Sequence, residues 1–260
     1  MHFHFVTAKS FFLFLFLTAL QGCSKKEDPI TESETGTIAG TLLRYDDKTN
    51  QYADASGISV SIIGMPDKQT TTAPDGRFKL EKIPFGNHDL VFSKLGYGTY
   101  KIFGIEHFRQ SNTVSGTPST TTLKRVISFG SISNTTVEQL LPAVVNDNNF
   151  IGIAFSYSVK PQPTSSNRAY TRSFVGKKND FTPLEALGYS GLKGALSNNV
   201  IGSFSVEELY GFGLNKGDSV YVKVYGDSFY SNDYTDPISG NTLFPNLNPV
   251  APPAIGFIVP

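Results

Sequence analysis

The sequence predicts an all-β protein made of two tandem β-sandwich domains. Glycine (24), proline (15), phenylalanine (21) and tyrosine (12) are abundant among its 260 residues, and this composition is typical of short strands joined by tight turns. Apolar and polar residues alternate over several short segments, as they do in strands with one buried face. Long stretches with the 3.6-residue apolar period of an amphipathic helix are missing.

Residues 1–22 have the features of a signal peptide. Lys9 precedes an apolar stretch, Phe11–Leu20, that is shorter than the ~20 residues needed to span a bilayer. The stretch ends in Leu20-Gln21-Gly22-Cys23, which resembles the lipobox of bacterial lipoproteins. The resemblance implies that residues 1–22 are removed and that Cys23 becomes the lipidated N-terminus. The alternative is an ordinary signal peptide followed by an incidental buried cysteine.

Residues 23–35 are polar and charged and show no apolar period, which predicts a solvated tether behind the lipid. Ser24 and Lys26-Glu27-Asp28 resemble the sorting and export signals of lipoproteins in some Gram-negative glycan-degrading bacteria. The resemblance implies anchoring in the outer membrane, at the cell surface rather than on the periplasmic face. A generic hydrophilic linker explains the three charged residues equally well.

Charge and cysteine content exclude further classes. Lys plus Arg total 22 and Asp plus Glu total 22, so no net field draws the protein to nucleic acid. The single cysteine is assigned to lipid, which leaves none for a disulfide. Removing the signal peptide leaves enough chain for two domains of ~100–150 residues with cores of their own.

The first predicted domain covers residues 36–124. Ile58, Val60 and Ile62 alternate with small residues, as in a half-buried strand. Pro74-Asp75-Gly76 predicts a hairpin turn, because proline fixes φ and glycine accepts a positive φ. The strands expected in this domain are Thr37–Leu43, Ile58–Ile62, Thr70–Ala73, Arg77–Glu81 and His88–Phe92.

The same residues carry a family resemblance over about residues 36–105. The order Gly36-x-x-x-Gly40, Asp75-Gly76-x-Phe78-x-Leu80, Ile83-Pro84-x-Gly86 and Gly96-Tyr97 resembles the carboxypeptidase regulatory-like domain. The resemblance implies a seven-stranded transthyretin-like sandwich, which is also grouped with carbohydrate-binding-like folds. It does not imply peptidase activity.

A zinc site is not expected. Zinc carboxypeptidases need a His-x-x-Glu pair and a third histidine, whereas the mature chain has only His88 and His107 and neither begins that motif. We expect both to be ordinary polar residues, one of a strand and one of a loop.

The second predicted domain covers residues 125–260. The Ser/Thr/Gly/Pro-rich stretch Gln110–Thr120 predicts a long loop ahead of it, and Thr121–Arg125 closes the first domain. Ser205 with Glu208 three residues later predicts a capped helical turn. The strands expected here are Val126–Ser131, Phe150–Val159, Ala169–Val175, Ser219–Tyr225 and Ile255–Val259.

This half resembles a fibronectin type III or related immunoglobulin-like domain through Leu214, Gly217 and Tyr221. In that family a tyrosine three residues after the glycine makes a corner hydrogen bond. Here the spacing is four, so Val220 is a candidate for the inward position instead.

The segment Tyr225–Asp236 follows a predicted strand and is rich in aromatic and acidic residues. Aromatic rings exposed on such a loop stack on sugar rings, whereas rings in the core serve packing, and the absence of tryptophan favours packing. Three aspartates of this loop lack the Asp-x-Asp-x-Asp-Gly spacing of a calcium loop, so a solvated turn is expected. The candidate ligand-binding residues are Tyr225, Phe229, Tyr230 and Tyr234.

Catalytic motifs are missing from the sequence, including a Gly-x-Ser-x-Gly elbow, a nucleotide-binding glycine loop and a cysteine nucleophile. The sequence therefore predicts a non-catalytic envelope lipoprotein without metal or cofactor, which binds a polysaccharide or a surface protein partner. One alternative is a structural spacer or adhesin. The other is a hydrolase whose paired carboxylates come from distant parts of the chain.

Overall fold

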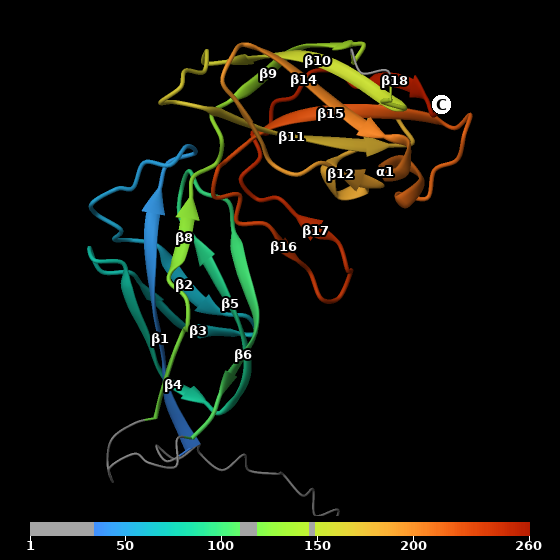
Figure 1. Cartoon of the computed structure of the whole chain (residues 1–260). Coiled ribbons are helices and arrows are strands. Elements are labelled where there is room, and N and C mark those ends of the chain that lie inside the picture. The colour runs from blue at the N-terminus through green and yellow to red at the C-terminus, as the bar shows by residue number, and fades with distance from the viewer. Residues whose placement is uncertain (1–33, 110–118, 146–148) are drawn as a thin grey trace, which may run out of the picture.

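The computed structural model describes residues 34–109, 119–145 and 149–260, and over these residues the protein is nearly all β (Figure 1). The predicted signal peptide, the lipidated Cys23, residues 23–33 of the tether and most of the Gln110–Thr120 loop lie outside this part. Among the described helices, none is long and apolar enough to cross a membrane. The strands pack as sheets on sheets, which confirms the predicted all-β sandwich class.

The first sandwich packs two four-stranded sheets. Its core takes alternate residues of each strand, such as Ile38 and Leu42 of one sheet and Val60 and Phe92 of the other, all fully buried. In one sheet, β1 (Thr35–Tyr45) pairs antiparallel with β4 (Arg77–Pro84) and parallel with β7 (Thr120–Thr122) and β8 (Ile127–Gly130). The other has the order β3 (Met65–Thr71), β2 (Ser59–Ile62), β5 (Gly86–Ser93) and β6 (Tyr100–His107).

The turn at Pro74–Gly76 is present, but the hairpin predicted around it is wrong. The strands on its two sides belong to different sheets, because β3 pairs with β2 and β4 pairs with β1. Gly76 has φ +78° and its carbonyl accepts the Leu42 N–H at 2.9 Å. A Cβ there would lie 1.8 Å from the Leu42 carbonyl oxygen. The turn therefore lies flat on β1 and carries the chain from one sheet to the other.

The first sandwich extends beyond the boundary expected at residue 124. β8 pairs in parallel with β1, and Ile127 and Phe129 are buried in the first core. The sequence placed this strand in the second domain because the polar stretch before it resembles a linker. Only its pairing with a strand some 85 residues earlier assigns it to the first sandwich.

The second sandwich also packs two sheets around a core of its own. Val220, Val222 and Val224 are fully buried on the inner face of its longest sheet, as their alternation predicted. One sheet has the order β14 (Asn199–Ser205), β10 (Gly152–Lys160) and β9 (Thr136–Pro142). The other has the order β12 (Gly188–Tyr189), β11 (Ala169–Gly176), β15 (Ser219–Asp227) and β18 (Ile255–Ile258). Strand β13 (Lys193–Ala195) also pairs with β11, and a hairpin, β16 (Tyr234–Thr235) and β17 (Thr242–Leu243), stands apart.

The helical turn predicted at Ser205 is confirmed as α1 (Val206–Gly211), beside a short 3₁₀ turn, η2 (Pro183–Glu185). The Ser205 hydroxyl accepts the Glu208 N–H at 3.2 Å, and the Glu208 carboxylate accepts the Ser205 N–H at 2.8 Å. Leu209 is fully buried and fastens the helix to the core. Val220 takes the inward position expected from the shifted glycine spacing.

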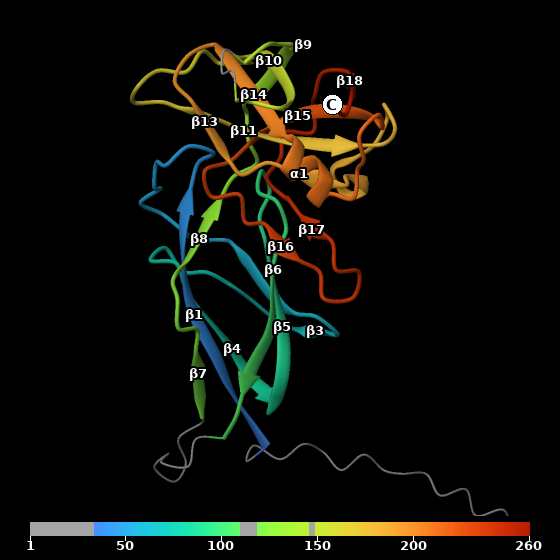
Figure 2. The same ribbon diagram turned by 45° about the vertical axis from the view of Figure 1, so that its right-hand side comes forward.

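The second sandwich lies across one end of the first, and its strands run crosswise to those of the first (Figures 1 and 2). Strand β1 begins at the end of the first sandwich that is remote from the second and runs toward their junction (Figures 1 and 2). The β16–β17 hairpin descends from the second sandwich beside β6, and both views place it there. The described chain therefore starts at one end of the molecule, and the junction lies at the other end of β1.

Candidate functional site

The segment Ser228–Asp233 leaves β15 and crosses onto the first sandwich rather than projecting free of it. The Phe229 N–H donates to the Asp47 carbonyl at 3.1 Å, and the Ser228 hydroxyl donates to the Ser131 carbonyl. The Asn232 amide accepts the Gly130 N–H and donates to the Ser128 carbonyl, both at 2.8 Å. A Cβ on Gly130 would lie 2.4 Å from the Tyr230 carbonyl oxygen, so glycine is required for this approach.

A second set of amide contacts fixes the junction. Asn246 is fully buried; its side-chain amide donates to the carbonyls of Gly130 at 3.0 Å and Tyr230 at 2.8 Å, and accepts the Gly98 N–H at 3.0 Å. Asn248 donates to the carbonyl of Thr135, at the start of β9, at 3.0 Å, and Lys48 of the first sandwich donates from its Nζ to the Thr135 hydroxyl at 3.3 Å. Because buried amides lose these bonds if the sandwiches move apart, the two sandwiches are held in one orientation.

Aromatic rings line the surface at this junction. We define the junction ridge as Arg44, Tyr45, Tyr52, Phe229 and Tyr230. The ring centroids of Tyr45 and Tyr230 lie 4.2 Å apart, and those of Phe229 and Tyr230 lie 4.9 Å apart. The Arg44 guanidinium lies 4.3 Å from the Tyr52 ring centroid. Tyr52 is 43% exposed and Phe229 is 41% exposed, so each sandwich contributes one exposed ring. Arg44 and Tyr52 lie on the opposite face of β1 from Tyr45, which pairs with Gln51, so the ridge passes around the end of that strand.

Local hydrogen bonds place the part of the ridge that comes from the first sandwich. The Tyr52 N–H donates to the Arg44 carbonyl at 2.8 Å, which brings the loop after β1 back alongside that strand. The Asp46 carboxylate accepts the N–H groups of Lys48 and Asn50 and closes the loop. The loop is therefore fixed by hydrogen bonds in a conformation that exposes Tyr52.

Polar groups lie beside the rings of the ridge. Gln51 is exposed and its amide oxygen accepts the Tyr45 hydroxyl at 3.3 Å. The Arg44 Nε is buried and has no acceptor within the described part of the chain, which is an uncommon and costly condition for a donor. Burial raises the pKa of the Tyr230 hydroxyl, aided by the neighbouring Tyr45. Tyr230 is therefore a neutral hydrogen-bonding group at pH 7.

The structure brings together two of the four candidate ligand-binding residues and separates the other two. Tyr225 is 8% exposed and packs against Phe174 with centroids 5.6 Å apart, in a small cluster on the outer face of β11 and β15. Tyr234 lies on β16 and packs against Tyr100 and Phe103 of β6 at 6.3 and 5.9 Å. Of the four candidates, only Phe229 and Tyr230 belong to the junction ridge. Their role in binding remains a prediction.

The three aspartates of this loop have separate partners. Asp227 is fully buried and its carboxylate accepts the Arg172 Nε at 2.8 Å. Burial raises the Asp227 pKa, and the Arg172 charge opposes that rise. Asp233 accepts the Ser231 hydroxyl, and Asp236 accepts the Ile238 N–H at 2.9 Å. Within the described ranges, no cluster of three metal-ligating side chains forms.

The two histidines lie at the remote end of the first sandwich. His88 is on β5, and His107 ends β6, where the sequence predicted a loop. The His88 Nε2 lies 2.7 Å from the Pro84 carbonyl, and the His107 Nδ1 lies 2.8 Å from the Thr121 hydroxyl. Burial and the neighbouring His88 lower the pKa of the His107 imidazole. Each ring is held by a neutral oxygen, as expected of structural histidines.

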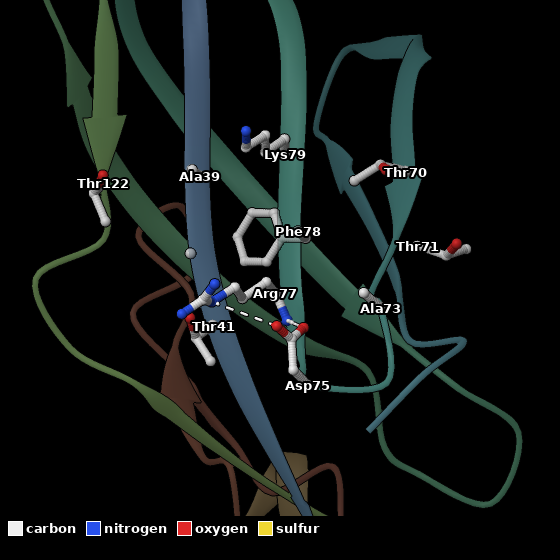
Figure 3. A pocket seen from close by; sticks show the side chains of 11 residues that line it. Ala39, Thr41, Thr70, Thr71, Ala73, Asp75, Arg77, Phe78, Lys79 and Thr122 are labelled. Carbon is white, nitrogen blue, oxygen red and sulfur yellow. Dashed lines mark hydrogen bonds and ion pairs between the residues drawn. The ribbon is translucent and has the colours of Figure 1, made fainter. Parts of the chain in front are cut away.

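A cavity of about 500 Å³ lies on the first sandwich, along β1 and β4 (Figure 3). Threonine hydroxyls and the Arg77 guanidinium line it, and Arg77 pairs with Asp75 at 3.5 Å. The Phe78 ring points toward β1 and is only 3% exposed. This ring has no open face for stacking, so the junction ridge is the better candidate.

Sequence analysis missed the first sandwich's share of the ridge. Arg44, Tyr45 and Tyr52 lie on either side of the loop after β1, and no local pattern relates them to residues almost 180 positions later. No signal in the sequence marks Tyr45 and Tyr52 as part of a site.

Comparisons with known proteins give no family for this chain. No protein-family profile matches it, and no curated protein is similar enough to match. Solved structures give weak alignments. A DUF3823 family protein from Parabacteroides merdae aligns at 8% identity over 86% of this chain and 99% of its own, with TM-score 0.31. A putative carbohydrate binding protein from Bacteroides uniformis aligns at 10% identity over 85% and 98%, with TM-score 0.29.

A type II cohesin–X-dockerin complex from Acetivibrio cellulolyticus aligns at 20% identity over 36% of this chain, with TM-score 0.28. This chain spans only 56% of that structure's chain. Scores this low carry no argument about function. The fold and the site define a two-sandwich protein with an aromatic surface at its junction, and the proposals below rest on its own residues.

Proposed function

We propose that this chain is a non-catalytic lipoprotein of the bacterial outer membrane that binds a polysaccharide at the cell surface, on the junction ridge. The observation that carries the proposal is the pair of exposed rings, Tyr52 of the first sandwich beside Arg44 and Phe229 of the second beside Tyr230. The apolar faces of sugar rings stack on such rings. Guanidinium, amide and phenol groups beside them supply the hydrogen bonds that orient a sugar.

Because the junction ridge extends over both sandwiches, it favours a polysaccharide over a monosaccharide as the ligand. Its rings are contributed by two sandwiches held in one orientation by the buried Asn246. A polysaccharide that passes around the end of β1 would contact both exposed rings, whereas a monosaccharide would reach only one. Lipid on Cys23 would attach the chain at the end opposite the ridge, because β1 begins there (Figure 1). The first sandwich would then lie between the membrane and the ridge.

Affinity electrophoresis on a panel of polysaccharides tests the proposal. We expect Tyr52→Ala and Phe229→Ala each to weaken retention by tenfold or more, because each removes one stacking ring. Tyr210→Ala is the matched control, since Tyr210 is 47% exposed on α1 in the second sandwich and outside the ridge.

Retention that is unchanged in both ridge variants would reject the ridge as the site. If no glycan retains the wild-type protein while cells that display the protein still attach to surfaces, the spacer or adhesin hypothesis is favoured instead.

A further inference from the structure

The first sandwich is open along one side. On its other side the chain crosses from β3 to β4 through the Pro74–Gly76 turn. On the open side, a groove of about 410 Å³ lies between β6 and the β7–β8 segment. The apolar side chains that line it pack against the core on one side, and their other side is exposed in the groove. We call this the edge groove; its apolar residues are Tyr100, Ile102, Ile105, Leu123 and Ile127.

The backbone edges beside this groove are blocked near the junction and open farther away. The Asn232 side-chain amide caps β8 as a neighbouring strand would, since it donates to the Ser128 carbonyl and accepts the Gly130 N–H. The Tyr234 ring covers the start of β6. Beyond these caps, β6 pairs only with β5 among the described strands. An uncapped strand edge over an apolar groove is a surface that an extended peptide can complete.

Charge at the rim indicates the chemistry of that peptide. Lys124 and Arg125 are exposed at the mouth of the groove, and neither forms an ion pair within the described ranges. Glu106 is the single acidic residue of the lining. The rim therefore carries an excess of positive charge, although the chain as a whole is neutral.

We propose that the edge groove binds an extended acidic segment of a partner protein. Aliphatic side chains of the segment enter the groove between Ile105 and Leu123, its backbone pairs with the free edge of β6, and its carboxylates meet Lys124 and Arg125. This site shares no residue with the junction ridge, so it does not depend on the proposed glycan site.

Fluorescence anisotropy with the full mature chain and a labelled peptide of alternating glutamate and valine tests the proposal. We expect saturable binding that weakens with added salt. The double variant Lys124→Glu/Arg125→Glu should bind this peptide at least tenfold more weakly and should instead bind a peptide of alternating lysine and valine. Lys216→Glu, an exposed position in the second sandwich, is the matched control and should bind as the wild type does.

Hydrogen exchange of the wild-type complex gives a readout that does not depend on variants. The amides between Gly104 and His107 should become more protected when the acidic peptide binds, because strand pairing shields them. Equal binding of the two peptides by the wild type, or binding unaffected by charge reversal, would overturn the proposal. So would binding of a long-chain fatty acid with none of the peptide.

Discussion

Tyr225 and Phe229 lie four residues apart but have opposite environments. Tyr225 is the last aromatic on β15, and the outer face of that sheet is covered by Phe174, Phe181 and Phe244. Phe229 follows the point at which the chain leaves the sheet, and its ring stays at the surface. The role of an aromatic residue in this segment is therefore decided by whether the strand has ended.

This difference predicts opposite costs of truncation. Tyr225→Ala should lower the free energy of unfolding by about 3–5 kcal/mol, because it empties a well-packed site. Phe229→Ala should lower it by only about 1–2 kcal/mol, because its ring is 41% exposed although it contacts Tyr170 and Tyr230. Urea unfolding of both variants measures the difference. Similar losses in both would mean that Phe229 is also a packing residue, and the ridge would lose one of its two open rings.

At the level of strands and turns, local alternation was sufficient where one face of a strand is buried. The patterns at Thr37–Leu43 and Ser219–Tyr225 predicted β1 and β15 because buried and partly exposed residues alternate along them. Pairing partners were not predictable from such patterns. The Pro74–Gly76 turn has the same local chemistry in a hairpin as in a crossing between sheets, and only contact with Leu42 decides between them.

The same limit applies to the candidate site. The density of aromatic residues drew attention to Phe229 and Tyr230, which the structure places on the ridge. The density of aromatic residues could not distinguish them from Tyr225, because Tyr225 is buried by tertiary contacts with residues such as Phe181 and Phe244. Tyr45 and Tyr52 could not be found at all from sequence, since the ridge forms only when the two sandwiches meet.

Assignment of β8 to the first sandwich leads to a prediction about where the chain can be divided. A fragment 34–131 should fold, whereas a fragment 34–124 should be much less stable. The shorter fragment loses Ile127 and Phe129, which are 5% and 0% exposed, and each such side chain contributes about 1.5–3 kcal/mol on burial. Circular dichroism and thermal unfolding of the two fragments test this. Equal stability would place the boundary at residue 124, as the sequence suggested.

At the scale of the whole molecule, the proposed anchor and the junction ridge lie at opposite ends of the first sandwich (Figure 1). Residues 24–34 separate Cys23 from β1, and at full extension they reach at most ~40 Å. Strand β1 adds 11 residues at ~3.3 Å each before the chain arrives at the junction. The first sandwich would then act as a spacer that holds the ridge away from the membrane surface. The binding and spacer hypotheses are therefore compatible, because they concern different parts of the protein.

Replacement of the proposed lipid attachment site tests this arrangement in cells. Two or three acyl chains hold a protein firmly, since each buried CH₂ contributes ~0.8 kcal/mol. We therefore expect the wild type to need detergent for extraction and Cys23→Ala to be released without it. Ser24→Ala, next to the cysteine, is the matched control and should stay detergent-dependent. Protease digestion of intact cells should remove the wild-type chain if it is at the surface. A Cys23→Ala protein that still requires detergent would reject lipid anchoring, and protection from protease would place the protein on the periplasmic face.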